Sequence, residues 1–154
     1  MTVTLKPKTT EAVPVVSLTV KATLKTIMDD IGNLPDEIMQ DCQQQEIEIM
    51  GPFIFEYRGA DGNPETQFDL EMALPVKEGL NYQGKYKYKT LAPIECVEQR
   101  FTGPLSQLEE KGYGPLMNAM QEQGFAIKDT CREVYTKWVE PESPENIIEL
   151  QMAI

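Results

Sequence analysis

The chain has 154 residues, of which 41% are hydrophobic, and its formal net charge is −11. This length and composition predict one domain with a packed core and exclude wholesale disorder. The acidic charge disfavours direct binding of nucleic acids and of anionic membranes, because their phosphates would be repelled.

The absence of histidine excludes Ser-His-Asp and Cys-His catalysis and most catalytic zinc sites. The three cysteines, Cys42, Cys96 and Cys131, are widely separated and form no CxxC motif. Reduced, mostly buried thiols in a cytoplasmic protein are therefore expected, with no metal and no cofactor. The polar first residues contain no apolar core of a signal peptide. The chain also has no run of 18 apolar residues, so no membrane span is predicted.

The first half of the chain is expected to contain a loose lead-in over residues 1–12, then strands and one helix. Alternation and β-branched residues predict strands over 13–27, 52–59 and 68–76. Asn33 is predicted to cap the N-terminus of the helix, with Pro35 in its first turn. Asp36 and Glu37 suit the positive end of the helix. The buried stripe of this helix is expected to contain Ile38, Met39 and Cys42.

The second half is predicted to follow a glycine-containing connector at 77–86. A strand over 86–101 comes first, and the lysines of its "YKYK" start are expected to protect a solvated edge rather than to bind nucleic acid. A helix is predicted to open at Pro104, to kink or restart at Pro115 and to end at Gly124. The last strands are predicted over 131–139 and 147–154.

These elements form the order β-α-β-β twice, at about 13–76 and 86–154. Residues 53–76 align with 131–154 without a gap, and Tyr57 then matches Tyr135. The offset is 78 residues, the difference between positions 135 and 57. Shared element order and hairpin length favour a duplicated unit.

The segments "GPFIFEY", "FDLEMALPV", "RFTGPLSQL…YGPLM" and "REVYTKWVEPESPENIIELQMAI" resemble the GyrI-like small-molecule-binding domain, the effector-binding domain of AraC-type and MerR-type multidrug regulators. The resemblance covers the chain from about residue 13. It implies an α+β fold with two pseudo-symmetric β-α-β-β modules, an antiparallel sheet flanked by helices, and a central ligand pocket within a single domain. Because the resemblance takes up nearly all of the 154 residues, the helix-turn-helix domain of the regulators is not expected in this sequence. The end of the chain also departs from the family pattern at Ile148 and Ala153.

The candidate site centres on Glu133, which shares a strand face with Tyr135. A carboxylate there must be solvated, paired or used. One interpretation is an edge or surface strand with a lysine partner. The resemblance instead implies a buried glutamate that binds lipophilic cations among aromatic rings. The candidate ring and thioether residues, for each of which ordinary core packing is the alternative, are Phe55, Tyr57, Tyr82, Phe101, Tyr113, Met117, Tyr135 and Trp138.

Two details refine this site. By the offset of 78, Phe55 occupies the position that corresponds to Glu133, so one module supplies a ring where the other supplies a charge. Trp138 has the opposite parity to Glu133 and is expected to face away unless the strand bulges.

The function predicted from these features is binding of cationic or amphipathic aromatic small molecules, with a protein partner or a second copy of the chain as a further expected partner. The resemblance leaves two alternatives open. One is a hydrolase that opens cyclopropane rings in toxins, with Glu133 as acid or base. The other is an inhibitor that binds DNA gyrase through an acidic surface.

Overall fold

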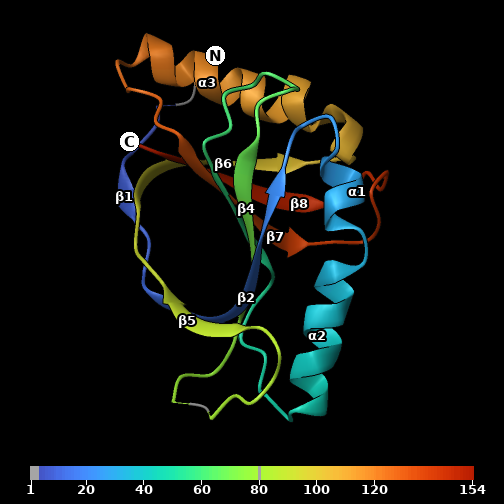
Figure 1. Cartoon of the computed structure of the whole chain (residues 1–154). Helices are drawn as coiled ribbons and strands as arrows, with labels where there is room; N and C mark the ends of the chain where they lie inside the picture. Colours follow the sequence, from blue (N-terminus) through green and yellow to red (C-terminus); the bar gives the residue numbers. More distant parts are fainter. Residues whose placement is uncertain (1–3, 80) are drawn as a thin grey trace.

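The computed structural model describes residues 4–79 and 81–154 and shows an α+β fold built on one curled antiparallel sheet (Figure 1). Residues 1–3 of the predicted lead-in and residue 80 of the predicted connector lie outside the described residues. The sheet has eight strands in the described part, in the order β1-β6-β8-β7-β3-β4-β2-β5. The strands are β1 (Lys8–Thr9), β2 (Val13–Ala22), β3 (Ile54–Arg58), β4 (Phe68–Pro75), β5 (Lys87–Leu91), β6 (Glu95–Thr102), β7 (Thr130–Lys137) and β8 (Ile147–Ala153).

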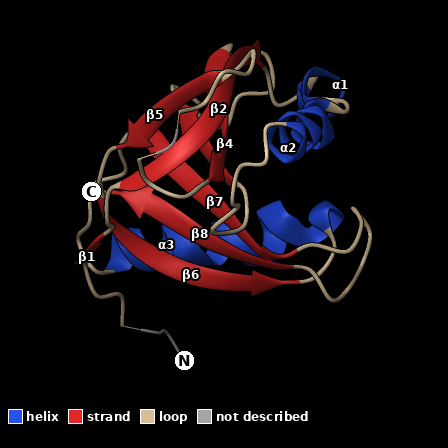
Figure 2. Cartoon of the chain, turned by 90° about the horizontal axis from the view of Figure 1, so that it is seen from below, coloured by secondary structure: helices blue, strands red, loops and turns tan. Residues whose placement is uncertain are grey.

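Two groups of helices interrupt the strand order. The first group is α1 (Ile27–Ile31) and α2 (Leu34–Gln44), and it joins β2 to β3. The second group joins β6 to β7 and consists of a 3₁₀ turn η1 (Leu105–Gln107), a π-helical segment η2 (Leu108–Tyr113) and α3 (Gly114–Glu122). Figure 2 shows the two groups beside the two halves of the sheet. The restart of the second helix at Pro115 is as predicted, because Pro115 lies in the first turn of α3.

The two modules have the same register, which confirms the predicted pseudo-symmetric architecture. Phe55 lies opposite Met72 in the β3–β4 hairpin, and Glu133 lies opposite Leu150 in the β7–β8 hairpin. Each of these positions is related to its counterpart by 78 residues. The modules join through β3 and β7, where Phe55 is paired directly with Glu133. This pair therefore lies on the pseudo-two-fold axis.

Both helical groups cover the same face of the sheet. In the first module, Ile38 and Cys42 of α2 are completely buried against the apolar residues of β3 and β4. In the second module, Leu116 and Met120 of α3 are buried in the same way with residues of β6 and β8. Burying these two apolar stripes is what holds the helices on the sheet. The centre of this face, between the two groups, is where β3 and β7 meet.

Four expectations about local structure need correction. The lead-in contains a short strand, β1, which pairs with β6. Residues 86–101 form two strands, since β5 pairs with β2 and β6 pairs with β8. The first long strand ends at Ala22, before α1 begins. Asn33 precedes α2 as predicted, but its side chain makes no capping hydrogen bond.

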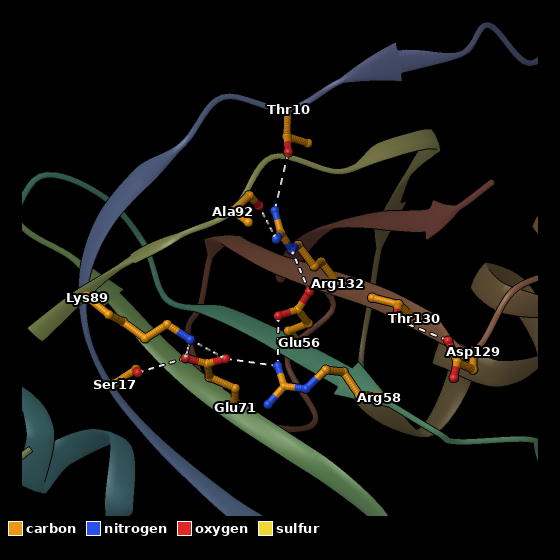
Figure 3. A network of polar contacts seen from close by, with 10 residues as sticks. All are labelled: Thr10, Ser17, Glu56, Arg58, Glu71, Lys89, Ala92, Asp129, Thr130 and Arg132. Carbon is orange, nitrogen blue, oxygen red and sulfur yellow. Dashed lines mark hydrogen bonds and ion pairs between the residues drawn. The ribbon is translucent and has the colours of Figure 1, made fainter. Parts of the chain in front are cut away.

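The opposite face of the sheet carries a network of buried charges (Figure 3). Arg132 is only 2% exposed, and its Nε donates to Glu56 Oε1 at 3.3 Å. Its other nitrogens donate to the carbonyl of Ala92 at 2.6 Å and to Thr10 Oγ1 at 3.3 Å. Thr10 and Ala92 belong to the segments after β1 and after β5, so Arg132 ties both segments to the centre of the sheet (Figure 3).

The network continues through Glu71, which is 1% exposed. Its carboxylate accepts from Ser17 at 2.8 Å and from Arg58 at 2.9 Å, and it lies 2.9 Å from the Lys89 ammonium. Arg58 also donates to Glu56, which links the two parts of the network. Lys89 belongs to the edge strand β5, but it is half-buried and paired with Glu71 rather than solvated as the sequence predicted.

We predict that Arg132→Met lowers the free energy of unfolding by about 3–5 kcal/mol, because it removes one partner from a buried ion pair and leaves the Ala92 carbonyl without its donor. Urea unfolding at neutral pH measures the effect. The matched control is Arg100→Met, which breaks the exposed pair with Glu149 and should cost about 1 kcal/mol or less. Equal losses in the two variants would contradict the importance of the buried network.

Candidate functional site

The carboxylate of Glu133 is buried on the helix-covered face and is surrounded by three tyrosines. Tyr57 and Tyr135 donate to its Oε1 at 2.8 and 2.6 Å, and Tyr113 donates to its Oε2 at 2.5 Å. The Glu133 side chain makes no ion pair with any described lysine or arginine, and the residue is 3% exposed. The interpretation of a surface strand with a lysine partner is therefore wrong. These four residues are called the tyrosine–glutamate cluster below.

Three separate elements supply the tyrosines. Tyr57 comes from β3, Tyr135 from β7 itself, and Tyr113 from the end of the π-helical segment η2. Gly112 brings η2 close to the sheet, because a Cβ at this position would lie 3.0 Å from Leu150 Cδ1. This close approach places the Tyr113 hydroxyl on the carboxylate.

The buried environment determines the protonation of the cluster. Burial raises the pKa of Glu133, and the hydrogen bonds from Tyr113, Tyr135 and Tyr57 only partly oppose that increase. Burial and the charge of Glu133 also raise the pKa values of the three tyrosines well above 10, so their hydroxyls remain donors at neutral pH. Cys131 Sγ lies 4.0 Å from the Tyr113 hydroxyl. Because burial raises its pKa to about 12, Cys131 is an inert thiol.

A cavity of about 460 Å³ lies beside the cluster. It is bounded by α1 and α2, by the start of β3, and by η1 with the segment after β7. Its lining residues are mostly apolar: Met28, Ile31, Gly32, Pro35, Asp36, Met39, Gly51, Pro52, Phe53, Phe55, Leu74, Leu105, Tyr135, Trp138 and Pro141. Tyr135 connects the two features, because its ring lines the cavity and its hydroxyl is bonded to Glu133.

One wall of this central cavity consists of aromatic rings. The Phe55 and Tyr135 centroids are 4.9 Å apart with an edge-to-face geometry, and Tyr135 meets Trp138 in the same way at 5.6 Å. Phe53 extends the row, since its ring centroid is 6.1 Å from that of Phe55. The residues Phe53, Phe55, Tyr135 and Trp138 are called the aromatic wall. Trp138 reaches it because the β7–β8 register shifts between Val134 and Lys137, the kind of bulge that the parity of Trp138 required.

The structure brings together six of the nine predicted site residues, in the cluster or on the wall: Phe55, Tyr57, Tyr113, Glu133, Tyr135 and Trp138. The other three lie elsewhere. Phe101 is 4% exposed in the core of the second module. Met117 is 39% exposed on α3, and the Tyr82 hydroxyl donates to Asp41 on α2.

Several cavity residues were not predicted for the site. Phe53 could have been found, because it precedes Phe55 by two positions and shares its strand face. Met39 was expected mainly to fill the core from the buried helix stripe, but it is half-buried and lines the cavity. Asp36 was interpreted only as a helix-start residue, and no sequence signal distinguishes it from Glu37.

The described residues contain no group of three histidine, cysteine, aspartate or glutamate side chains that could hold a metal ion. None of the described helices is long and apolar enough to cross a membrane.

No family model and no curated protein matches the chain by sequence. Its fold is similar to those of several solved structures. The C-terminal domain of EcmrR superimposes with a TM-score of 0.73 at 18% identity, over 97% of this chain and 95% of that one. In the EcmrR–DNA complex, the TM-score is 0.70, and this chain spans 56% of the EcmrR chain.

Two further structures show the same similarity. SAV2435, solved with tetraphenylphosphonium bound, has a TM-score of 0.64 at 11% identity over 97% of this chain and 92% of that one. A hydrolase encoded by lin2189 from Listeria innocua has a TM-score of 0.53 at 14% identity, with 96% and 92% covered. The chain therefore has the GyrI-like fold that its segments predicted.

We predict that Glu133→Gln gains stability relative to the wild type as the pH rises. The raised pKa of folded Glu133 means that protonated Glu133 contributes stability that is fully present below the ordinary pKa of 4.5. That contribution is lost as the pH rises through the folded pKa, whereas glutamine is neutral throughout. The difference should reach about 1.4 kcal/mol for each unit by which the pKa is raised. Urea unfolding between about pH 4 and pH 8 measures it.

Tyr113→Phe is the companion variant, because it removes one hydrogen bond that favours the charged form of Glu133. It should raise the pKa of Glu133 further and move the pH window of the stability loss upward. Parallel stability profiles for the wild type and Glu133→Gln would contradict the raised pKa.

Proposed function

We propose that the protein binds lipophilic aromatic cations in the central cavity. The observation that carries this proposal is a buried carboxylate, Glu133, that has no cationic partner among the described residues and is connected by Tyr135 to a cavity with an aromatic wall. A buried charge without a counter-ion is costly in free energy, and a bound cation reduces that cost.

The aromatic wall suits the same ligand. Each ring face attracts a nearby cation by about 0.5–2 kcal/mol, depending on how far the pair is desolvated. Tyr135 contributes more than an isolated ring would, because its hydroxyl donates to a carboxylate and the phenol thereby becomes richer in electrons. The ring and the carboxylate thus act together on a positive charge in the cavity.

The size and lining of the cavity suit a drug-sized molecule. Its volume of about 460 Å³ falls within the range of roughly 300–1,000 Å³ that is usual for small-molecule sites. Met28 and Met39 lie on its helical side, and their flexible thioethers can adapt to ligands of different shapes. These features favour a site of broad rather than narrow specificity.

The similar structures support this proposal. SAV2435 has been solved with tetraphenylphosphonium, a lipophilic aromatic cation, and it shares the fold of this chain. The EcmrR structures show that the same fold also occurs as one part of a longer DNA-bound protein. A protein partner that responds to the occupied cavity is the corresponding extension of the proposal for this chain.

A titration with tetraphenylphosphonium tests the proposal. Trp138 is the single tryptophan of the chain and lines the cavity, so its fluorescence reports occupancy directly. We predict micromolar binding that becomes about tenfold weaker in Glu133→Gln, which corresponds to the loss of about 1.4 kcal/mol. Binding should also weaken as the pH falls through the raised pKa of Glu133, because protonation removes the charge.

The control is Glu149→Gln, which removes one negative charge from a residue paired with Arg100 and outside the cavity lining. It should bind the probe as the wild type does. The proposal would be contradicted if the wild type did not bind tetraphenylphosphonium at tens of micromolar, or if Glu133→Gln bound it equally well.

A hydrolase is the second candidate, because solved proteins of this fold include hydrolases and because a glutamate with a raised pKa can transfer protons. The geometry favours it less than binding. Both carboxylate oxygens of Glu133 accept tyrosine hydroxyls, and Glu133 does not line the cavity. Ring-opening of a cyclopropane-bearing alkylating compound by the wild type, abolished in Glu133→Gln, would establish this activity instead.

A further inference from the structure

We infer that Asp36 is the carboxylate that a bound cation contacts, at the mouth of the central cavity, whereas Glu133 acts on the ligand through Tyr135. This inference rests on the proposed function and specifies how the cavity recognises charge. It also predicts which ligands gain most from Asp36, namely those with an aromatic body and a compact ammonium group at one end.

Glu133 is enclosed by its own partners. Tyr57 and Tyr135 occupy Oε1, Tyr113 occupies Oε2, and the residue is 3% exposed. The cavity is lined by Phe55, which is paired with Glu133, and by the ring of Tyr135, but not by the carboxylate itself. A cation in this cavity therefore contacts the Tyr135 ring, and the Glu133 carboxylate attracts it only across that ring.

Asp36 has the opposite properties. It lies in the first turn of α2, is exposed to solvent and lines the cavity. No lysine, arginine or glutamate is among the lining residues, so Asp36 is the one carboxylate of that lining. Its side chain makes no hydrogen bond or ion pair with any residue that the structure describes, although several exposed carboxylates of the chain do.

The helix start explains why acidic residues occur here but not which one faces the ligand. Both Asp36 and Glu37 lie in the first turn of α2, where negative charge is favoured by the helix dipole. Only Asp36 lines the cavity, whereas the charge of Glu37 acts on Lys85. The chain therefore offers a natural control one residue away.

The position of Asp36 predicts which cations it recognises. The apolar side of the cavity takes the aromatic body of the ligand, so a charge that contacts Asp36 must lie at the solvent end. A trimethylammonium group on a flexible chain can reach that end. The charge of tetraphenylphosphonium is shielded by four rings, so this cation should depend on Asp36 much less.

The experiment compares Asp36→Asn with Glu37→Gln, using 4-phenylbutyltrimethylammonium and tetraphenylphosphonium as probes and Trp138 fluorescence as the readout. Asp36→Asn should bind the ammonium about fivefold more weakly at low ionic strength, the range expected for an exposed ion pair. The difference should disappear near 0.5 M salt, because the Debye length there falls to roughly 4 Å. Glu37→Gln should match the wild type at both salt concentrations.

Three results would overturn the inference. Equal affinities for Asp36→Asn and Glu37→Gln would show that Asp36 makes no contact, and a Glu133-dependent affinity for tetraphenylphosphonium would then leave the proposed function intact. Equal losses for both probes in Asp36→Asn would exclude a contact specific to the solvent end. A wild-type protein that binds neither probe would reject the inference and the proposed function together.

Discussion

The buried carboxylate of Glu133 constrains the rest of the structure because it lies where the two modules join. Its neighbour on the adjacent strand β3 is Phe55, which carries no charge and so cannot neutralise the carboxylate. Its stability in the folded protein depends on hydroxyl donors from β3, β7 and η2 that meet at one point. The second helical group must therefore pack closely on the sheet, and Gly112 permits that approach.

Each face of the sheet buries a glutamate carboxylate, and the two carboxylates are stabilised in different ways. Burial would raise the pKa of Glu71 also, but Lys89, Ser17 and Arg58 outweigh that effect, and its pKa is lowered. Glu133 receives only neutral hydroxyl donors, and its pKa is raised. Glu71 is thus a completed structural ion pair, whereas Glu133 retains the capacity to favour a cation that comes from outside the chain.

Much of the fold followed from the sequence because strand alternation and a constant offset are local, repeated signals. They placed Tyr57, Glu133 and Tyr135 on one face without any knowledge of the helices. Phe101 and Tyr82 could not be assigned in this way, because an aromatic residue has the same pattern in a core as in a site. The position of Trp138 at the cavity depends on a register shift between β7 and β8, which the sequence does not signal. Whether Asp36 lines the cavity depends on how α2 is rotated about its axis relative to the sheet, and the sequence of one helix turn does not determine that rotation.

The two modules differ at the cavity. The offset of 78 residues relates the ends of the two helices, Gln44 and Glu122, and it relates Pro35 to Tyr113. In the second module, the tyrosine side chain extends to the axis and bonds to Glu133. In the first module, the corresponding residue Pro35 lines the cavity. The departure from symmetry places this cavity beside the enclosed carboxylate of Glu133, to which Tyr135 connects it, as the proposed binding of cations needs.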